Sequence, residues 1–447
     1  MIVMKFGGSS LGTPARIDGC VDLVEGEIRR SPIVVVSACG KTTDALLAAA
    51  GKALAGTVDG TPIREIHADL LSGLGLSSEV LGALLDELET LLTGISLTRE
   101  LTPRTRDLVM SFGERLSARV FAGALSARGI AAEPVDSFEA GLVTTRSHGA
   151  AVPLPPSYEL LAGSLFEADG VPVVTGFLGA DEDGAITTLG RSGSDYSASI
   201  IAKAVGAAQI QIWTDVDGVM TCDPCLDRCA ASLRRLSFEE ASELAYYGAK
   251  VLHRNTLIPA MEEGIPVRVL NTANPFDEGT TIVSRAEITE RVAKSVVYKE
   301  DVCLVTLASL RLKSAAELLS ASLDAMRVHG VGVHMATTSE STVSLVTENG
   351  FDPRSLAAAL GSLEGLAAVR SEEGKAIVCV VGEELKGNAG VLGRIFSAVS
   401  AEGIKARMVS QSASEINVAL LVDNDQVEAA VRALHRELLL SGKEAAA

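Results

Sequence analysis

With 447 residues, 47% of them hydrophobic, the chain is long enough for two to four domains with buried cores. Its 39 Lys and Arg against 57 Asp and Glu give a net charge of −18, which argues against a nucleic-acid or anionic-membrane surface as partner. No apolar run reaches the ~18 residues of a membrane span. The start, MIVMKFGG, enters a strand without a leader pattern, and the seven cysteines lack disulfide-like regularity, so we expect a cytoplasmic protein.

The first predicted strand, residues 2–6, runs into a small-residue loop. Lys5 lies inside this strand, and Gly7, Gly8 and Ser9 follow it. A lysine there is either an edge-strand charge kept for solubility or a cation that points into a cleft. The adjoining glycines favour phosphate binding through backbone N–H groups. The loop is not a Walker A motif, because GxxxxGK[ST] is absent.

Two further segments carry candidate substrate contacts. The apolar strand over residues 33–36 ends in SACGKTT, where Ser37 and Thr43 are either substrate hydroxyls or, as is more common, helix caps. Glu114, in SFGERLS, is predicted to open a helix over residues 116–127. There it either complements the helix dipole or pairs with a substrate ammonium. Between these segments, we interpret residues 60–105 as a helical insertion without visible chemistry.

The stretch TTLGRSGSDYSAS, residues 187–199, carries the strongest signal. It predicts a glycine turn followed by a helix with Ser194 or Asp195 at its N-cap. Glycine amides and a helix N-terminus attract an anion, and Arg191 offers a planar fork for a carboxylate or phosphate. Asp195 adds negative charge beside this anion site, which requires a cation or ammonium between them. The stretch therefore predicts an anion-handling catalytic loop.

The strand predicted over residues 209–213 runs into the loop TDVDGVMTCDP. Such a loop is either a nucleotide-side loop or a turn-rich connection. Cys222, Cys225 and Cys229 have a C-x2-C-x3-C spacing, which suggests zinc or a redox pair. No fourth ligand is evident, so we assign no metal site. Further on, Ser237 and Glu240 predict a capping box at the start of a helix.

From about residue 286 the chain is an internal repeat. We expect a first domain over residues 1–285, a first copy over 286–371 and a second over 372–447. Each copy predicts the order strand, helix, strand, strand, helix, in a small sheet with helices on one face. Neither copy holds a cluster of titratable groups, so we assign both to sensing and assembly.

The motifs, taken in chain order, resemble those of the aspartate kinases: KFGGSS, VVVSACGKTTD, SFGERLS, TTLGRSGSDYSAS, WTDVDGVMTCDP, ELAYYGAKVLH, IPVRVLN and SQSASEINVALLV. The tail resembles the paired ACT domains of these enzymes. The resemblance implies an α/β fold, with a three-layer parallel-sheet domain of the amino-acid-kinase type followed by two ferredoxin-like βαββαβ ACT domains. It implies ATP-dependent, Mg²⁺-supported phosphorylation of the β-carboxylate of L-aspartate to 4-phospho-L-aspartate, the first step toward lysine, threonine and methionine.

The resemblance also implies roles for individual residues. Lys5 would neutralise the transferred phosphoryl group, and Asp195 would orient that lysine. Arg191 would bind the α-carboxylate of aspartate and Glu114 its ammonium, with Ser37 and Thr43 lining the same pocket. The nucleotide would be held by Gly7, Gly8, Ser9, Thr214, Asp215, Met220, Asp223, Lys250 and Val251.

Regulation is implied by the ACT repeats. An end-product amino acid would bind the first copy near Ser314, Val333, His334, Thr338, Ser339 and Glu340. Lysine is the first hypothesis and threonine the second. His334 stands where lysine-sensitive members often have aspartate, which weakens the lysine assignment. The paired repeats imply at least a homodimer. Two alternatives stay open: another amino-acid kinase, such as a glutamate 5-kinase or an acetylglutamate kinase, or a catalytically silent amino-acid sensor.

Overall fold

The computed structural model describes residues 1–249, 254–286, 293–309 and 314–440. They form two compact units. The first unit comprises Met1–Val219, Ser232–Ser242 and Lys250–Ala286, and the second comprises Met220–Ala231, Glu243–Ala249 and Glu287–Ala447. Two short segments that precede the repeats in sequence therefore pack with the repeats. The described residues include no helix that is both long and apolar enough to cross a membrane.

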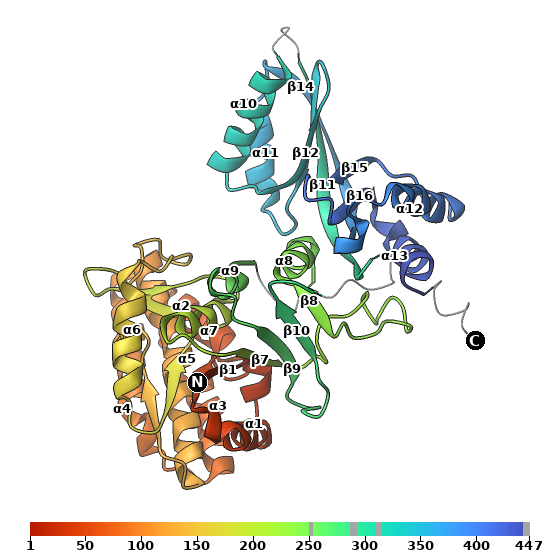
Figure 1. The fold of residues 1–447 in the computed structure, drawn as a ribbon. Coiled ribbons are helices and arrows are strands. Elements are labelled where there is room, and N and C mark those ends of the chain that lie inside the picture. Colours follow the sequence, from red (N-terminus) through yellow and green to blue (C-terminus); the bar gives the residue numbers. More distant parts are fainter. Residues whose placement is uncertain (250–253, 287–292, 310–313, 441–447) are drawn as a thin grey trace. The chain divides into compact units, whose positions relative to one another are not determined.

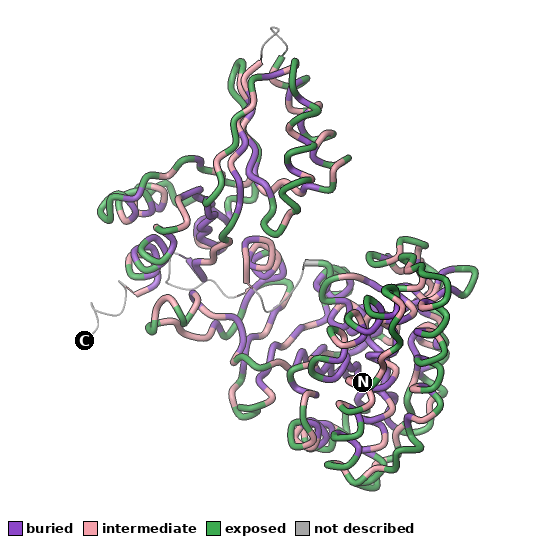
Figure 2. Tube along the Cα trace, turned by 180° about the vertical axis from the view of Figure 1, so that it is seen from behind, coloured by how far each residue is buried: buried purple, intermediate pink, exposed green. Residues whose placement is uncertain are grey.

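An eight-stranded sheet forms the centre of the first unit, in the order β3-β4-β2-β1-β7-β9-β10-β8. Its strands are β1 (Ile2–Phe6), β2 (Pro32–Val36), β3 (Ala132–Val135), β4 (Val171–Thr175), β7 (Ile210–Thr214), β8 (Arg235–Ser237), β9 (Val267–Asn271) and β10 (Thr280–Val283). All neighbours are parallel except β9 and β10. β1, β2 and β4 are buried along their whole length (Figure 2), as expected for parallel strands covered on both faces.

Helices cover both faces of this sheet (Figure 1). On one side, five helices share a hydrophobic core with β1, β2 and β4: α1 (Pro14–Glu27), α2 (Thr42–Leu54), α3 (Thr61–Leu74), α4 (Glu79–Thr98) and α5 (Pro103–Ala127). On the other side, α7 (Gly193–Ala204) contacts β1, β2 and β7, and it packs against α6 (Pro156–Glu167) and α9 (Arg254–Glu263). A small hairpin, β5 (Leu178–Ala180) and β6 (Ile186–Thr188), leads into α7. The predicted three-layer α/β class is confirmed.

Two helix starts differ from the sequence prediction. α5 begins at Pro103 instead of residue 116, because the Thr102 side chain accepts a hydrogen bond from the Thr105 amide and Pro103 suits the first helical position. Glu114 therefore lies in the middle of a helix, and its interpretation as a helix-start residue is wrong. α7 begins at Gly193, so the predicted caps Ser194 and Asp195 lie in its first turn.

The predicted capping box is confirmed at the start of α8 (Phe238–Tyr247). The Ser237 amide donates to Glu240 Oε2 over 2.9 Å, and the Glu240 amide donates to Ser237 Oγ over 3.2 Å. Each side chain thus satisfies a backbone donor that the helix itself leaves unpaired.

The second unit contains a six-stranded antiparallel sheet in the order β12-β13-β11-β14-β16-β15. Its strands are β11 (Ser295–Ser309), β12 (Val333–Thr338), β13 (Thr342–Thr347), β14 (Ala367–Val381), β15 (Met408–Gln411) and β16 (Asn417–Asp423). Its helices are α10 (Ala315–Val328), α11 (Pro353–Gly361), α12 (Ala389–Ala401) and α13 (Val427–His435). The strand and helix order within each copy follows the sequence prediction.

The two copies share this one sheet because β11 and β14 are each 15 residues long. The first half of β11, from Ser295, pairs with the second half of β14 up to Val381, which belongs to the second copy. The second half of β11, up to Ser309, pairs with the first half of β14, from Ala367. Each central strand therefore contributes to both copies.

Candidate active site

A pocket of about 280 Å³ lies where β1, β2 and β4 end. Ligands of open α/β sheets bind at this carboxyl edge. Its wall comes from the loops that follow these strands, from the middle of α5 and from the start of α7. The lining residues are Lys5, Gly8, Ser37, Ala38, Gly40, Thr43, Glu114, Phe177, Gly190, Ser192, Gly193, Ser194 and Asp195.

Strand alternation directs Lys5 into this pocket. Ile2, Met4 and Phe6 face the core formed with α1 to α5, so Lys5 points to the opposite face, toward α7. There its Nζ lies 2.5 Å from Oδ1 of Asp195, in the first turn of α7. Both residues are less than a tenth exposed. The pair places an ammonium, held by one carboxylate, in the pocket wall.

Glu114 reaches the pocket from α5. It is 5% exposed, and its Oε1 accepts a hydrogen bond from the Ala38 amide over 3.1 Å. Burial raises the pKa of Glu114 to about 8, although the Ala38 hydrogen bond and the positive charge of Lys5 act in the opposite direction. The carboxyl group is therefore mostly neutral at pH 7 until a cation arrives beside it.

Two loops at the pocket expose their backbone amides, because neighbouring backbone leaves no room for a side chain at Gly8 and Gly190. A Cβ added to Gly8 would lie 2.8 Å from the carbonyl oxygen of Ala38. Gly190 has a φ of +79°, and a Cβ there would lie 2.9 Å from the carbonyl oxygen of Gly149. Together with the N-terminus of α7, this glycine cradle fits the phosphate groups of a nucleotide.

Asp107, on α5, fixes the start of the glycine turn. Its Oδ1 accepts a hydrogen bond from the Thr188 hydroxyl over 2.8 Å. Its Oδ2 accepts one from the backbone amide of the same residue over 3.1 Å. Oδ2 also accepts from the Gly149 amide and from Nδ1 of His148. A buried carboxylate with four donors thus ties the end of β6, directly before the turn, to the helix that carries Glu114.

Comparisons with known proteins agree with this geometry. The amino acid kinase family matches residues 1–271, and an ACT domain matches residues 378–438. Aspartokinase 1, chloroplastic, of Arabidopsis thaliana is 38% identical over 462 residues, which cover 98% of this chain and 80% of the relative. The chain belongs to the aspartokinase family. Its reaction is therefore the phosphorylation of aspartate, in the pathway to the aspartate-derived amino acids.

Solved structures of aspartokinases have the same fold. The crystal structure of Escherichia coli aspartokinase III in complex with aspartate and ADP, in the R-state, is 30% identical and has a TM-score of 0.83, covering 98% of this chain and 99% of that one. Aspartokinase III of the same organism in complex with lysine and aspartate, in the T-state, has a TM-score of 0.78 at 30% identity and the same coverage.

Within this aspartokinase, the pocket brings together most of the residues predicted for chemistry and aspartate binding: Lys5, Ser37, Thr43, Glu114 and Asp195. Gly8, predicted to contact the ATP phosphates, lines the same pocket. Gly7 lies beside them, since a Cβ on it would be 3.5 Å from Lys5 Nζ, and Ser9 follows Gly8. Arg191 is exposed and is not among the lining residues, although Gly190 and Ser192 on either side of it are.

Sequence reasoning missed Phe177 and Asp107. Phe177 follows β4 with a φ of +68° and lines the pocket, and its amide donates to Ser197 Oγ on α7 over 2.9 Å. The available signal was the Gly176-Phe177 pair at the carboxyl end of an apolar strand. Asp107 had no such signal, because its partners lie 41, 42 and 81 positions away in sequence.

The residues predicted to bind the nucleotide are divided between the two units. Thr214 ends β7, next to β1, and its hydroxyl donates to Asp215 Oδ1 over 3.2 Å. Met220 and Asp223 belong to the second unit. There Asp223 accepts hydrogen bonds from the Tyr298 hydroxyl and the Cys225 amide. The predicted positions 250 and 251 lie outside the described residues.

In the second unit, the predicted effector residue His334 is already in contact with neighbouring groups. Its Nε2 lies 3.1 Å from Lys299 Nζ, and its carbonyl oxygen accepts the Tyr246 hydroxyl over 3.1 Å. Burial, with the charge of Lys299, lowers the pKa of His334 to about 4. Among the other predicted effector residues, Val333 is half-buried, Ser314 caps α10, and Thr338, Ser339 and Glu340 are exposed around the turn between β12 and β13.

Proposed function

We propose that this pocket transfers the γ-phosphoryl group of ATP to the β-carboxylate of L-aspartate, giving 4-phospho-L-aspartate and ADP. The Lys5–Asp195 pair carries the proposal, because it places a buried ammonium beside a cradle of backbone amides. A carboxylate oxygen attacks the γ-phosphorus, and the bond to the β,γ-bridging oxygen breaks with its electron pair passing to ADP. The nucleophile is already ionised near neutral pH, so the site needs no general base.

Lys5 and the glycine amides stabilise the transferred group. Phosphoryl transfer spreads charge over three equatorial oxygens and depends on in-line positioning. The Lys5 ammonium and the N-terminal amides of α7 meet that charge, and Asp195 keeps the ammonium in place. Because these donors are fixed before the substrates arrive, little reorganisation is required during the transfer.

Glu114 is proposed to hold the ammonium of aspartate. The arriving cation lowers the pKa of Glu114, which ionises and releases a proton to solvent. Ser37 and Thr43 supply hydroxyls on the same wall. Arg191, which stands between two lining residues, would bind the α-carboxylate through its planar fork.

ATP and Mg²⁺ are the proposed cofactors. In the first unit, Gly7, Gly8 and Ser9 would contact the phosphates, and Thr214, Asp215, Lys250 and Val251 the rest of the nucleotide. Mg²⁺ takes phosphate oxygens with one or two carboxylates. Of the two acidic residues that line the pocket, Glu114 is proposed for the ammonium of aspartate. Asp195 would hold Mg²⁺ through Oδ2, while its Oδ1 keeps the Lys5 ammonium in place. When bound, Mg²⁺ supplies charge neutralisation on the β- and γ-phosphates.

Feedback control by an amino acid is proposed for the second unit, at Ser314, Val333, His334, Thr338, Ser339 and Glu340. Lysine was the first hypothesis from sequence. The Lys299 ammonium beside His334 disfavours a second cation there and supports threonine. Titration calorimetry with lysine and threonine, singly and together, tests this proposal. Heat from neither amino acid would contradict it.

We also propose a cytoplasmic homodimer formed through the second unit. Among the described residues, β12 and β15 form the two edges of the six-stranded sheet, and a second copy can extend either edge. All seven cysteines are unpaired, which fits a reducing compartment. Light scattering of the purified protein tests the dimer, and a monomer at micromolar concentration would contradict it.

The reaction itself is tested by trapping the acyl phosphate as its hydroxamate. Purified protein with MgATP should give product from aspartate and far less from glutamate or N-acetylglutamate. Product mainly from one of the other acids would indicate a different amino-acid kinase. No product and no ADP from any of them would favour the catalytically silent sensor.

A further inference from the structure

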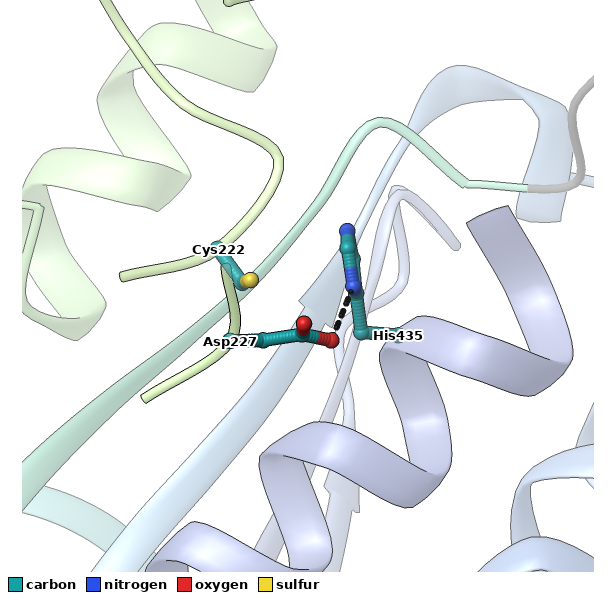
Figure 3. Close-up of side chains that lie close together, drawn as sticks. All are labelled: Cys222, Asp227 and His435. Carbon is teal, nitrogen blue, oxygen red and sulfur yellow. Dashed lines mark hydrogen bonds and ion pairs between the residues drawn. The ribbon is translucent and has the colours of Figure 1, made fainter. Parts of the chain in front are cut away.

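In the second unit, the loop formed by residues 220–231 packs against helix α13. Three side chains meet at this contact: Cys222 and Asp227 from the loop and His435 from the helix. His435, on α13, places Nδ1 2.8 Å from Asp227 Oδ2 and Nε2 2.9 Å from Thr221 Oγ1. The thiol of Cys222 lies beside this pair (Figure 3). One potential metal-binding atom from each of Cys222, Asp227 and His435 lies within 4.8 Å of the other two.

The surroundings of these three groups resemble a structural metal site. His435 is fully buried and Cys222 is 2% exposed, whereas Asp227 is half-buried at the edge. No hydrogen bond to the Cys222 thiol occurs within the parts of the chain that the structure describes. Burial, together with the negative charges of Asp227 and Asp223, raises the pKa of Cys222 to about 12.

Cys229 can complete the set from the same loop. Its amide donates to Asp227 Oδ1 over 2.9 Å, which anchors Cys229 beside one of the three grouped ligands. Sulfur, nitrogen and carboxylate oxygen are the donors that Zn²⁺ takes in tetrahedral sites. Thr221 would fix the ring of His435 from its far side, as outer partners of metal-binding histidines do.

We infer that Cys222, Asp227 and His435, with Cys229 as fourth ligand, bind a divalent cation of the zinc class. Binding releases the thiol protons of Cys222 and Cys229 to solvent. His435 carries its remaining proton on Nε2, where Thr221 Oγ1 accepts it, so that Nδ1 and the Asp227 carboxylate exchange their hydrogen bond for two metal bonds. The bound cation ties the loop to α13 and stabilises the second unit. This site lies outside the proposed phosphoryl-transfer chemistry, and it stands or falls independently of that chemistry.

The test uses the full-length protein, freed of metal with a chelator under reducing conditions and titrated with Co²⁺. The wild type should bind one equivalent and develop a thiolate-to-cobalt charge-transfer band in the near ultraviolet. One equivalent of Zn²⁺ should abolish the band and raise the melting temperature. A wild-type protein without the band, or with no response of its melting temperature to Zn²⁺, would overturn the inference.

Variants assign the ligands. Cys222→Ser and His435→Gln should each lose the band and the Zn²⁺-dependent rise in melting temperature. Cys303→Ser, which alters another buried cysteine of the same unit, should keep both. If His435→Gln fails to fold, Cys229→Ser at the exposed edge provides the decisive reading and should weaken Co²⁺ affinity at least tenfold. Retention of wild-type affinity in Cys222→Ser and Cys229→Ser would contradict the assignment.

Discussion

The carboxylate of Asp107 binds both the backbone amide and the hydroxyl of Thr188, across 81 positions of sequence. Thr188 ends β6, and the glycine turn of the active site begins two residues later. The same carboxylate sits on α5, the helix that carries Glu114. One side chain therefore sets the distance between the phosphate cradle and the proposed ammonium site.

Asp107→Asn should impair positioning without removing a reacting group. Asn can keep its oxygen toward the three N–H donors only by turning its nitrogen to the Thr188 hydroxyl, which must then reverse its hydrogen bond. The loss of the negative charge also weakens all four contacts, so the glycine turn should shift. A displacement of about 1 Å can cost about 100-fold in rate. We expect kcat/KM for aspartate to fall by about that factor, measured by the hydroxamate assay, with a smaller change in the KM for ATP.

The control for this change is Asp181→Asn in the β5–β6 turn. Asp181 is also buried, and its Oδ1 accepts amides of its own turn, a role that Asn can keep. This control should retain near-wild-type kinetics. If Asp107→Asn lowers only the melting temperature and leaves kcat/KM unchanged, Asp107 has a purely structural role.

Lys5→Met should remove most turnover. Loss of one donor to the developing charge typically costs about 2.7–4 kcal/mol, or about 100- to 1000-fold in kcat. The matched control is Lys203→Met. Lys203 is a partly exposed lysine at the far end of α7, and it forms an ion pair with Glu262 on α9. Near-wild-type kcat in Lys5→Met, measured by ADP release, would refute the assigned role.

Glu114 should make both substrate affinity and stability depend on pH. Its pKa of about 8 lies above the ordinary 4.5, so between these values the folded state holds a proton that the unfolded state has lost. The free energy of unfolding therefore falls as pH rises from 4.5 to 8. Over pH 6–8, the KM for aspartate should fall as pH rises, because binding requires the ionised carboxyl group.

Glu114→Gln separates these two effects. The neutral amide should abolish this part of the pH dependence of the melting temperature and weaken aspartate binding at every pH. Thermal denaturation and initial rates from pH 5 to 9 measure both quantities. A variant with the wild-type KM for aspartate would show that Glu114 does not bind the ammonium.

The lowered pKa of His334 predicts that the second unit loses stability in acid. Its pKa of about 4 lies below the ordinary 6.5, so in this interval the unfolded state binds a proton that the folded state excludes. This contribution to stability is present above pH 6.5 and is lost as pH falls toward 4. His334→Gln should flatten the melting temperature of this unit between pH 6.5 and 4. An unchanged slope would contradict the shift.

Much of the fold followed from sequence because local rules governed it. Apolar runs predicted β1, β2 and β7, and the Ser237–Glu240 capping box was predicted from spacing alone. The start of α5 was misplaced although Thr102-Pro103 repeats the Thr-Pro signal of α1. The merged sheet of the repeats was not predicted, because strand pairing across two copies leaves no local pattern.

The active site was predictable where one short motif supplied several residues. Lys5 with Gly8, and the stretch around Asp195, were found in this way and lie in one pocket. Groups whose partners are remote were missed or dismissed. The pairing of Cys222 with His435, on which the proposed metal site depends, left no signal in the sequence, because most of the second half of the chain separates the two residues.

The sharing of β11 and β14 between the repeats constrains how the protein is made. During synthesis on the ribosome, Ser295 emerges long before its strand partner Val381. Asp227 is made 208 residues before its hydrogen-bond partner His435. The second unit thus cannot reach its final structure by folding one copy at a time as it is translated. Its early segments remain dependent on late ones, and an unfinished chain exposes apolar strands that chaperones would have to cover.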